Sequence, residues 1–233
     1  MAYKAVIFDL SHTLVVGFSR SDFDNLFREM ADILSLSVEA LRTGWSATSS
    51  ERILGILRTI EANISHICDS LAVSVDEGQI RAAADKRIAL TQRSLQPRPD
   101  AVATLSQLRK GGLRIGLISD CSPDVPPLWE ASELARLVDE AILSCEVALR
   151  KPDPRIYLLA CDRLSVSPQD CLYVGDGGSH ELTGAARVGM SPVRIMVPFE
   201  DVNEYPRGEV DEWDGPTISA LSELRHLIFR HEK

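Results

Sequence analysis

Apolar residues are spaced along this chain in two different ways. Residues 4–9 (KAVIFD) form a short and almost continuous apolar run, which is typical of a strand buried on both faces. After residue 97, similar short runs alternate with stretches in which apolar residues recur at helical spacing. We predict further strands at 113–118, 139–144, 171–174 and 192–197. We predict helices between them at 101–109, 154–164, 180–188 and 218–229. Strands separated by helices predict an α/β fold, a Rossmann-like parallel sheet with helices on both faces.

Residues 16–96 follow a different pattern from the rest of the chain. Leucine, isoleucine and alanine recur there at helical spacing, strand-like runs are absent, and turn signals such as TGWSATSSE separate the segments. We therefore predict an all-helical domain inserted after the first strand. The α/β core would comprise residues 1–15 and 97–233, and the helical cap residues 16–96.

Composition and charge narrow the classes of partner. The net charge of −9 and the pI near 5.1 argue against nucleic acid or an anionic membrane surface as the main partner. The five cysteines include no CxxC pair and lie in apolar or helical stretches, so we expect buried free thiols in a reducing compartment. No run of 18 apolar residues occurs. These features predict a cytoplasmic protein.

Polar residues follow the predicted strands at the edge where parallel sheets bind ligands. Carboxylates, a hydroxyl and a lysine would meet there if the strands are neighbours. Together they suit a hard divalent cation such as Mg²⁺ and a phosphate, with oxygen ligands for the metal and Lys and Ser for the anion. The candidate residues are Asp9, Ser11, His12, Ser119, Asp120, Lys151, Asp176 and Glu181.

Four segments carrying these residues resemble the four motifs of the haloacid dehalogenase (HAD) superfamily. In chain order they are FDLSHTL, LISD, RKPDP and YVGDGGSHELTGAARVGM. The resemblance implies that Asp9 is a nucleophile that forms an aspartyl-phosphate and that Ser119 binds the phosphoryl oxygens. It implies that Lys151 offsets the negative charge. Mg²⁺ would be held by Asp9, Asp176 and the backbone carbonyl of Ser11.

Four residues depart from the family pattern. Ser11 replaces the aspartate that serves as acid and base in the family's phosphatases, and loss of such a group typically lowers a rate by ~10² to 10⁴. His12 stands where glycine is common, either as a turn residue with a left-handed backbone or as a substitute proton carrier. Asp120 either adds negative charge near the anion or caps the following segment. Glu181 is either the second acid of the last motif or a helix N-terminal glutamate.

The predicted cap should choose the leaving group, as helical caps do in this family. Arg42, Trp45 and Arg52 surround a turn between predicted cap helices and are candidate substrate contacts or ordinary packing residues. We expect a Mg²⁺-dependent phosphatase of a small phosphorylated metabolite, with low activity because of Ser11. The first alternative is a non-catalytic protein that binds a phospho-ligand or partner. The second is metal-independent hydrolysis, such as 2-haloacid dehalogenation, although the Gly175–Asp176 pair that the family's dehalogenases lack is present.

Overall fold

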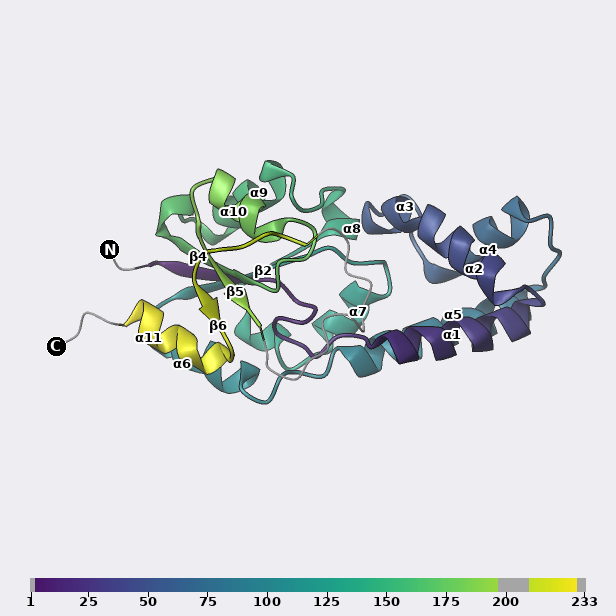
Figure 1. Cartoon of the computed structure of the whole chain (residues 1–233), viewed down its shortest axis with the longest axis horizontal. Coiled ribbons are helices and arrows are strands. Elements are labelled where there is room, and N and C mark those ends of the chain that lie inside the picture. Colours follow the sequence, from purple (N-terminus) through teal and green to yellow (C-terminus); the bar gives the residue numbers. More distant parts are fainter. Residues whose placement is uncertain (1–2, 197–209, 230–233) are drawn as a thin grey trace.

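A six-stranded sheet forms the centre of the protein (Figure 1). The structure is a computed structural model and describes residues 3–196 and 210–229. The strands lie in the order β3-β2-β1-β4-β5-β6, and all neighbouring pairs are parallel. Their bounds are β1 Ala5–Phe8, β2 Arg114–Ser119, β3 Glu140–Leu143, β4 Cys171–Gly175, β5 Ser191–Ile195 and β6 Thr217–Ile218. The predicted fold class is confirmed.

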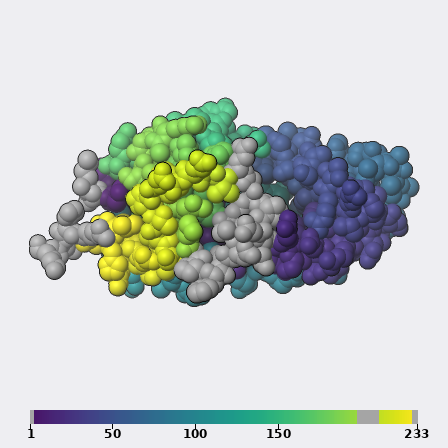
Figure 2. Space-filling model, in the orientation of Figure 1, coloured from purple at the N-terminus to yellow at the C-terminus, as the bar shows by residue number. Residues whose placement is uncertain are grey.

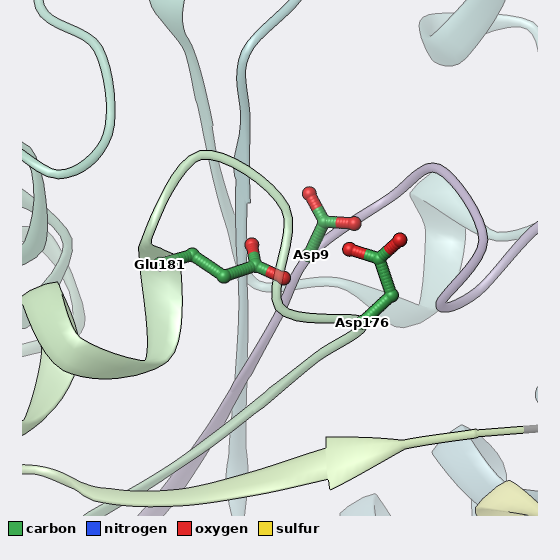
Figure 3. Close-up of side chains that lie close together, drawn as sticks. All are labelled: Asp9, Asp176 and Glu181. Atoms are coloured by element: carbon green, nitrogen blue, oxygen red, sulfur yellow. The ribbon is translucent and has the colours of Figure 1, made fainter. Parts of the chain in front are cut away.

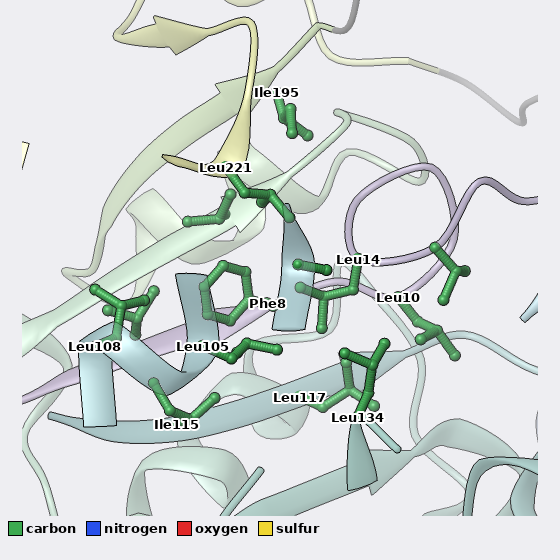
Figure 4. Packing of buried hydrophobic residues seen from close by; sticks show 14 of the residues in the cluster. Phe8, Leu10, Leu14, Leu105, Leu108, Ile115, Leu117, Leu134, Ile195 and Leu221 are labelled. Carbon is green, nitrogen blue, oxygen red and sulfur yellow. The ribbon is translucent and has the colours of Figure 1, made fainter. Parts of the chain in front are cut away.

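Helices cover both faces of the sheet because the side chains of β1 alternate between two cores. Val6 and Phe8 point into one core, where Leu105 of α6 is also buried (Figure 4). Ala5 and Ile7 point into the other core, with Ile156 of α9. The helices of this part of the chain are α6 Ala101–Lys110, α7 Val125–Glu130, α8 Ser144–Val147, α9 Pro154–Leu164, α10 Glu181–Arg187 and α11 Leu224–Ile228.

The predicted helix at 218–229 is wrong in its first half. Ile218 belongs to the edge strand β6 and pairs with Ile195 of β5, and a 3₁₀ turn at Leu221–Glu223 follows before α11 begins. Two residues of strand are too short to show a period of two, so the helical spacing farther along dominated the pattern. Residue 197, the end of the predicted strand at 192–197, lies outside the described residues.

An all-helical insert separates β1 from β2 and forms one end of the molecule (Figures 1 and 2). Four of its five helices start at residues whose side chains accept the first free backbone N–H groups: Ser19 and Asp76 form capping boxes before α1 and α5, and Ser37 and Thr59 cap α2 and α4. The insert buries a hydrophobic core of its own, which includes Met30. We propose that residues 16–96 be treated as the cap domain. The helices are α1 Arg20–Leu34, α2 Val38–Ala47, α3 Ser49–Ile53, α4 Ile60–Ser70 and α5 Glu77–Ser94.

The described residues bear on two expectations, the absence of a membrane-spanning segment and the state of the cysteines. None of the helices in this part of the chain combines the length and apolarity needed to cross a bilayer. All five cysteines are free thiols, four of them buried and Cys145 half-buried.

Candidate active site

The candidate site lies where the order of the strands reverses. From β1 the chain adds β2 and β3 on one side of the sheet, and β4, β5 and β6 lie on the other side. Such a switch point leaves a crevice at the carboxyl ends of the two central strands. Asp9 follows β1 and Asp176 follows β4, so the sequence delivers one carboxylate to each side of the crevice. In Figure 3 both side chains, together with Glu181 from the start of α10, converge on the same space.

Lys151 is the cation at the centre of these carboxylates. Its Nζ donates to Asp9 Oδ1 at 2.6 Å and to Glu181 Oε2 at 2.5 Å, and all three side chains are buried. Its backbone N–H donates to Asp120 Oδ1 at 3.0 Å. Asp120 therefore joins the end of β2 to the lysine loop. Its predicted capping role is wrong, because the residue before α7 is Asp124.

Glu181 occupies both of the positions that the sequence analysis considered. It is the first residue of α10, and its side chain also points into the site (Figure 3). Its side chain is fully buried and accepts hydrogen bonds from Tyr173 Oη at 2.8 Å and from Gly177 N at 2.9 Å. A Cβ on Gly175 would lie 2.2 Å from Glu181 Oε1, so glycine is required there for the carboxylate to fit. Three donors, including Lys151, therefore fix this carboxylate.

Burial and crowding of negative charge shift the protonation of the site. Burial raises the pKa of Asp9 to about 6, with Lys151 opposing the rise and Asp176 adding to it. Burial likewise raises the pKa of Glu181, against the effect of Lys151. Burial alone would lower the pKa of Lys151, but Asp9 and Glu181 raise it well above its ordinary value. Three buried carboxylates thus face one lysine, which leaves uncompensated negative charge.

This charge and the donor atoms fit a divalent cation. Oxygens of Asp9, Asp176 and Glu181 lie within 4.8 Å of one another. Mg²⁺ is usually bound through one or two carboxylates, waters and substrate phosphate. Since the oxygens of Glu181 already accept from Lys151, Tyr173 and the Gly177 backbone, we expect Asp9 and Asp176 to supply the carboxylate ligands.

A cavity of about 170 Å³ lies between the core and the insert and is lined by residues next to Asp9 in the chain, although Asp9, Asp176 and Glu181 do not line it. Ser11, Ser119 and Asp120 line it from the core, and Trp45 and Arg52 line it from the insert. Ser119 is buried at the end of β2. The structure therefore brings two of the three candidate cap contacts to the same cavity as the residues after β1 and β2.

Arg42, the third candidate cap contact, does not line this cavity. Its guanidinium forms an ion pair with Asp24 and lies 4.6 Å from the centre of the Phe27 ring. The helical register of α2 explains the difference, because Trp45 lies on the buried face whereas Arg42 is half-exposed. The packing interpretation applies to Arg42.

His12 has the left-handed backbone that the turn interpretation requires, with φ of 60°. Its carbonyl accepts from Arg98 Nη2 at 2.6 Å. Its ring packs so closely on Gly17 that a Cβ there would lie 2.7 Å from Cε1 of the imidazole. His12 is not among the residues lining the cavity, so its position favours the turn over proton transfer.

Sequence reasoning missed two buried charged residues near the site. Arg87 is only 5% exposed and lines the cavity from α5; its spacing from Ala83 and Ala84 on the buried face was an available signal. Asp211 accepts from the backbone N–H of Leu182 at 2.8 Å and thereby caps α10. No local pattern indicates that cap, because Asp211 comes from a segment 29 residues farther along.

The fold and the carboxylate–lysine site define a class of hydrolase, and comparison with known proteins gives the family. Residues 3–189 match the haloacid dehalogenase-like hydrolases, and the chain belongs to this family. It is 29% identical over 199 residues to (S)-2-haloacid dehalogenase 4A of Burkholderia cepacia, covering 82% of each chain. It is 36% identical over 129 residues to the glyceraldehyde 3-phosphate phosphatase of Methanopyrus kandleri, covering 50% of this chain and 53% of that protein.

A solved structure shares the whole fold. The 2-haloacid dehalogenase of Pseudomonas syringae pv. Tomato DC3000 superimposes with a TM-score of 0.71 at 22% identity, covering 99% of this chain and all of that one. The relatives thus include both dehalogenases and phosphatases, and the choice between these reactions depends on the residues of the site.

Proposed function

We propose that the protein is a Mg²⁺-dependent phosphatase that hydrolyses a small phosphorylated metabolite through an aspartyl-phosphate on Asp9. The observation that carries this proposal is the pair of buried carboxylates, Asp9 and Asp176, at the switch point of the sheet. They have more negative charge around them than Lys151 compensates. A divalent cation would restore the balance and allow an anionic phosphoryl group to bind, whereas metal-free displacement of a halide gives Asp176 no role.

Each residue has a definite task in this proposal. A carboxylate oxygen of Asp9 attacks phosphorus, the bond from phosphorus to the ester oxygen breaks, and that oxygen leaves with a proton from solvent. Water then attacks the phosphorus of the acyl phosphate, which releases inorganic phosphate and restores Asp9. Ser119 donates to a phosphoryl oxygen, and Lys151 offsets its charge.

The metal would be held by Asp9, Asp176 and the Ser11 carbonyl. When bound, Mg²⁺ supplies positive charge that neutralises the negative charge of a phosphoryl oxygen. Ser11 cannot transfer the proton that an aspartate would transfer, because a hydroxyl titrates far above neutral pH. We therefore expect slow turnover of alkyl phosphates, whose leaving groups need a proton, and faster turnover of aryl phosphates.

Ser11 also favours a second candidate, the hydrolysis of 2-haloacids. A halide leaves without a proton, so an Asp9 oxygen could displace it from carbon and water could then hydrolyse the resulting ester. The dehalogenase relative that spans 82% of this chain supports this candidate. The presence of Asp176 opposes it.

One set of assays separates the candidates. Purified protein is incubated with p-nitrophenyl phosphate, with and without EDTA, and with 2-chloropropionate. The phosphatase proposal predicts release of nitrophenol that needs Mg²⁺ and disappears in Asp9→Asn. Chloride release that EDTA does not affect would instead establish the dehalogenase. Binding of Mg²⁺ and phosphate without turnover on a broad panel of phosphate esters would refute both and indicate a binding protein.

A further inference from the structure

Arg87 presents an unused hydrogen-bond donor in the cavity between the core and the insert. Its side chain is 6% exposed, and among the described residues neither Nη1 nor Nε has a hydrogen-bond partner, although Nε forms an ion pair with Asp124. A buried donor left without an acceptor typically costs about 1–3 kcal/mol, so native proteins rarely retain one without a reason. Since Arg87 lines the same cavity as Ser11 and Ser119, a ligand held there can supply the acceptor.

The rest of the guanidinium is fixed by the core. Nε of Arg87 lies 3.3 Å from Asp124 Oδ2, and Nη2 donates to Ser122 Oγ at 3.3 Å. Ser122 Oγ donates in turn to Asp124 Oδ1 at 2.6 Å, and Thr91 also donates to Asp124. Asp124 is therefore a positioning residue. Its ion pair holds the Nε side of the guanidinium, and Nη1 is without a hydrogen-bond partner among the described residues.

Charge in the cavity wall favours an anion over a neutral acceptor. The insert contributes two guanidinium groups to the lining, Arg52 and Arg87, and the core contributes one carboxylate, Asp120. Burial, followed by the positive charge of Arg87, lowers the pKa of Arg52 to about 10. The two cations thus repel each other in a site largely removed from water. Arg52 donates through Nη1 to Trp45 O at 2.7 Å and to Asn63 Oδ1 at 3.1 Å, whereas Arg87 has buried nitrogens without a hydrogen-bond partner among the described residues.

Size and apolar walls restrict the anion further. The ring centres of Phe18 and Trp45 lie 4.9 and 5.9 Å from Cζ of Arg87, which leaves the guanidinium edge as the polar part of that wall. A cavity of about 170 Å³ is close to the size that holds a benzene molecule. A phosphoryl group at Ser119 therefore leaves room for only a few more atoms. A carboxylate on a chain of one or two carbons fits this space and can accept a charge-assisted hydrogen bond from Nη1.

We propose that Arg87 is the specificity residue of the cap and that it binds a carboxylate on the leaving group. The substrate is then the phosphate monoester of a short hydroxy acid. This proposal rests on the proposed phosphatase function and narrows its substrate class.

The test compares two esters that differ in one group. 2-Phosphoglycolate has a carboxylate where ethyl phosphate has a methyl group. We expect wild-type kcat/KM to be about 10- to 100-fold higher for 2-phosphoglycolate, as for a hydrogen bond between charged groups. Arg87→Met should lower kcat/KM for 2-phosphoglycolate by about that factor and leave ethyl phosphate nearly unchanged. Arg81→Met, on the exposed face of the same helix, is the matched control and should leave both values unchanged.

Two further variants keep the test decisive. Arg87→Lys retains the charge if Arg87→Met does not fold, and it should retain part of the preference for 2-phosphoglycolate. Calorimetric binding of both esters to Asp9→Asn, with and without Arg87→Met, measures the preference without turnover. Selective weakening of 2-phosphoglycolate binding by Arg87→Met, together with no hydrolysis of any phosphate ester by the wild-type protein, would refute the phosphatase and leave the carboxylate pocket. An Arg87 variant that affects both esters equally, in turnover or in binding, would refute the carboxylate pocket.

Discussion

Replacing Lys151 by methionine tests whether this lysine holds the buried carboxylates in place. Methionine has a similar length and no charge, so Asp9 and Glu181 would lose their common donor at 2.6 and 2.5 Å. Removing one partner of a buried ion pair typically costs about 3–5 kcal/mol, unless the remaining group takes up a proton. The size of the loss therefore depends on pH.

The magnitude follows from Asp9. Its pKa is raised from 3.8 to about 6, and at about 1.36 kcal/mol per pKa unit this destabilises the native protein by about 3 kcal/mol above pH 6. Because the pKa of Asp9 is higher in the native state than in the unfolded state, the free energy of unfolding falls as pH rises from 3.8 to the native pKa. Above the native pKa it is constant. Without Lys151 that pKa rises further. If Asp9 stays protonated at pH 7.5 in the variant, it destabilises the native state by about 5 kcal/mol, compared with about 3 kcal/mol in the wild type. Asp9 alone therefore accounts for a decrease of about 2 kcal/mol in the free energy of unfolding.

The assay is urea unfolding in EDTA, followed by tryptophan fluorescence. We expect Lys151→Met to lose about 2–5 kcal/mol at pH 7.5, with Glu181 accounting for the part beyond Asp9. At pH 5 the loss should be smaller by about 2 kcal/mol, because Asp9 is then protonated in both proteins. Lys110→Met, at an exposed position of α6, is the control. The same loss at both pH values would show that Lys151 acts through packing and refute the electrostatic reasoning.

Three other changes test the site. Ser11→Asp should raise the turnover of alkyl phosphates by about 10²-fold or more if only the acid–base group is missing, and an unchanged rate would contradict this. Gly175→Ala places a Cβ 2.2 Å from Glu181 Oε1, so it should lower the free energy of unfolding by about 1–3 kcal/mol; an unchanged urea midpoint would show that Glu181 can move freely. Mg²⁺ should bind about tenfold more weakly at pH 5 than at pH 7.5, because binding must displace the proton of Asp9. Titration calorimetry measures this, and Asp176→Asn should abolish the binding at both pH values.

The strands of the sheet were predictable because each central strand is buried on both faces and leaves a continuous apolar run. The residues after β1 and β4 could then be assigned to one crevice, since parallel strands end at the same edge. Asp9 and Asp176 do meet there, and Lys151 lies between the acids. The edge strand with Ile218 was not predictable, because two residues carry no period and its partner is set by tertiary packing.

The cap shows where sequence reasoning ends. Trp45 and Arg52 reach the cavity and Arg42 does not, although all three lie near one predicted turn. Proximity in sequence carries little information on which side a short helix presents. Arg87 was detectable in principle, since a charged residue on the apolar face of a long helix needs a buried partner. That partner, Asp124, lies 37 residues away along the chain and could not be identified from spacing.

The crowded charges of the site give Ser11 a physical meaning beyond the loss of an acid–base group. Without metal, Asp9 already titrates at about pH 6 because burial and Asp176 oppose its ionisation. A second carboxylate two residues farther along would raise the pKa of Asp9 again and protonate more of the nucleophile near neutral pH. Serine therefore leaves more of Asp9 ionised, but it cannot donate a proton to the leaving group. This combination favours substrates whose leaving groups need no proton, and the carboxylate contact proposed for Arg87 would tighten substrate binding without replacing the missing proton donor.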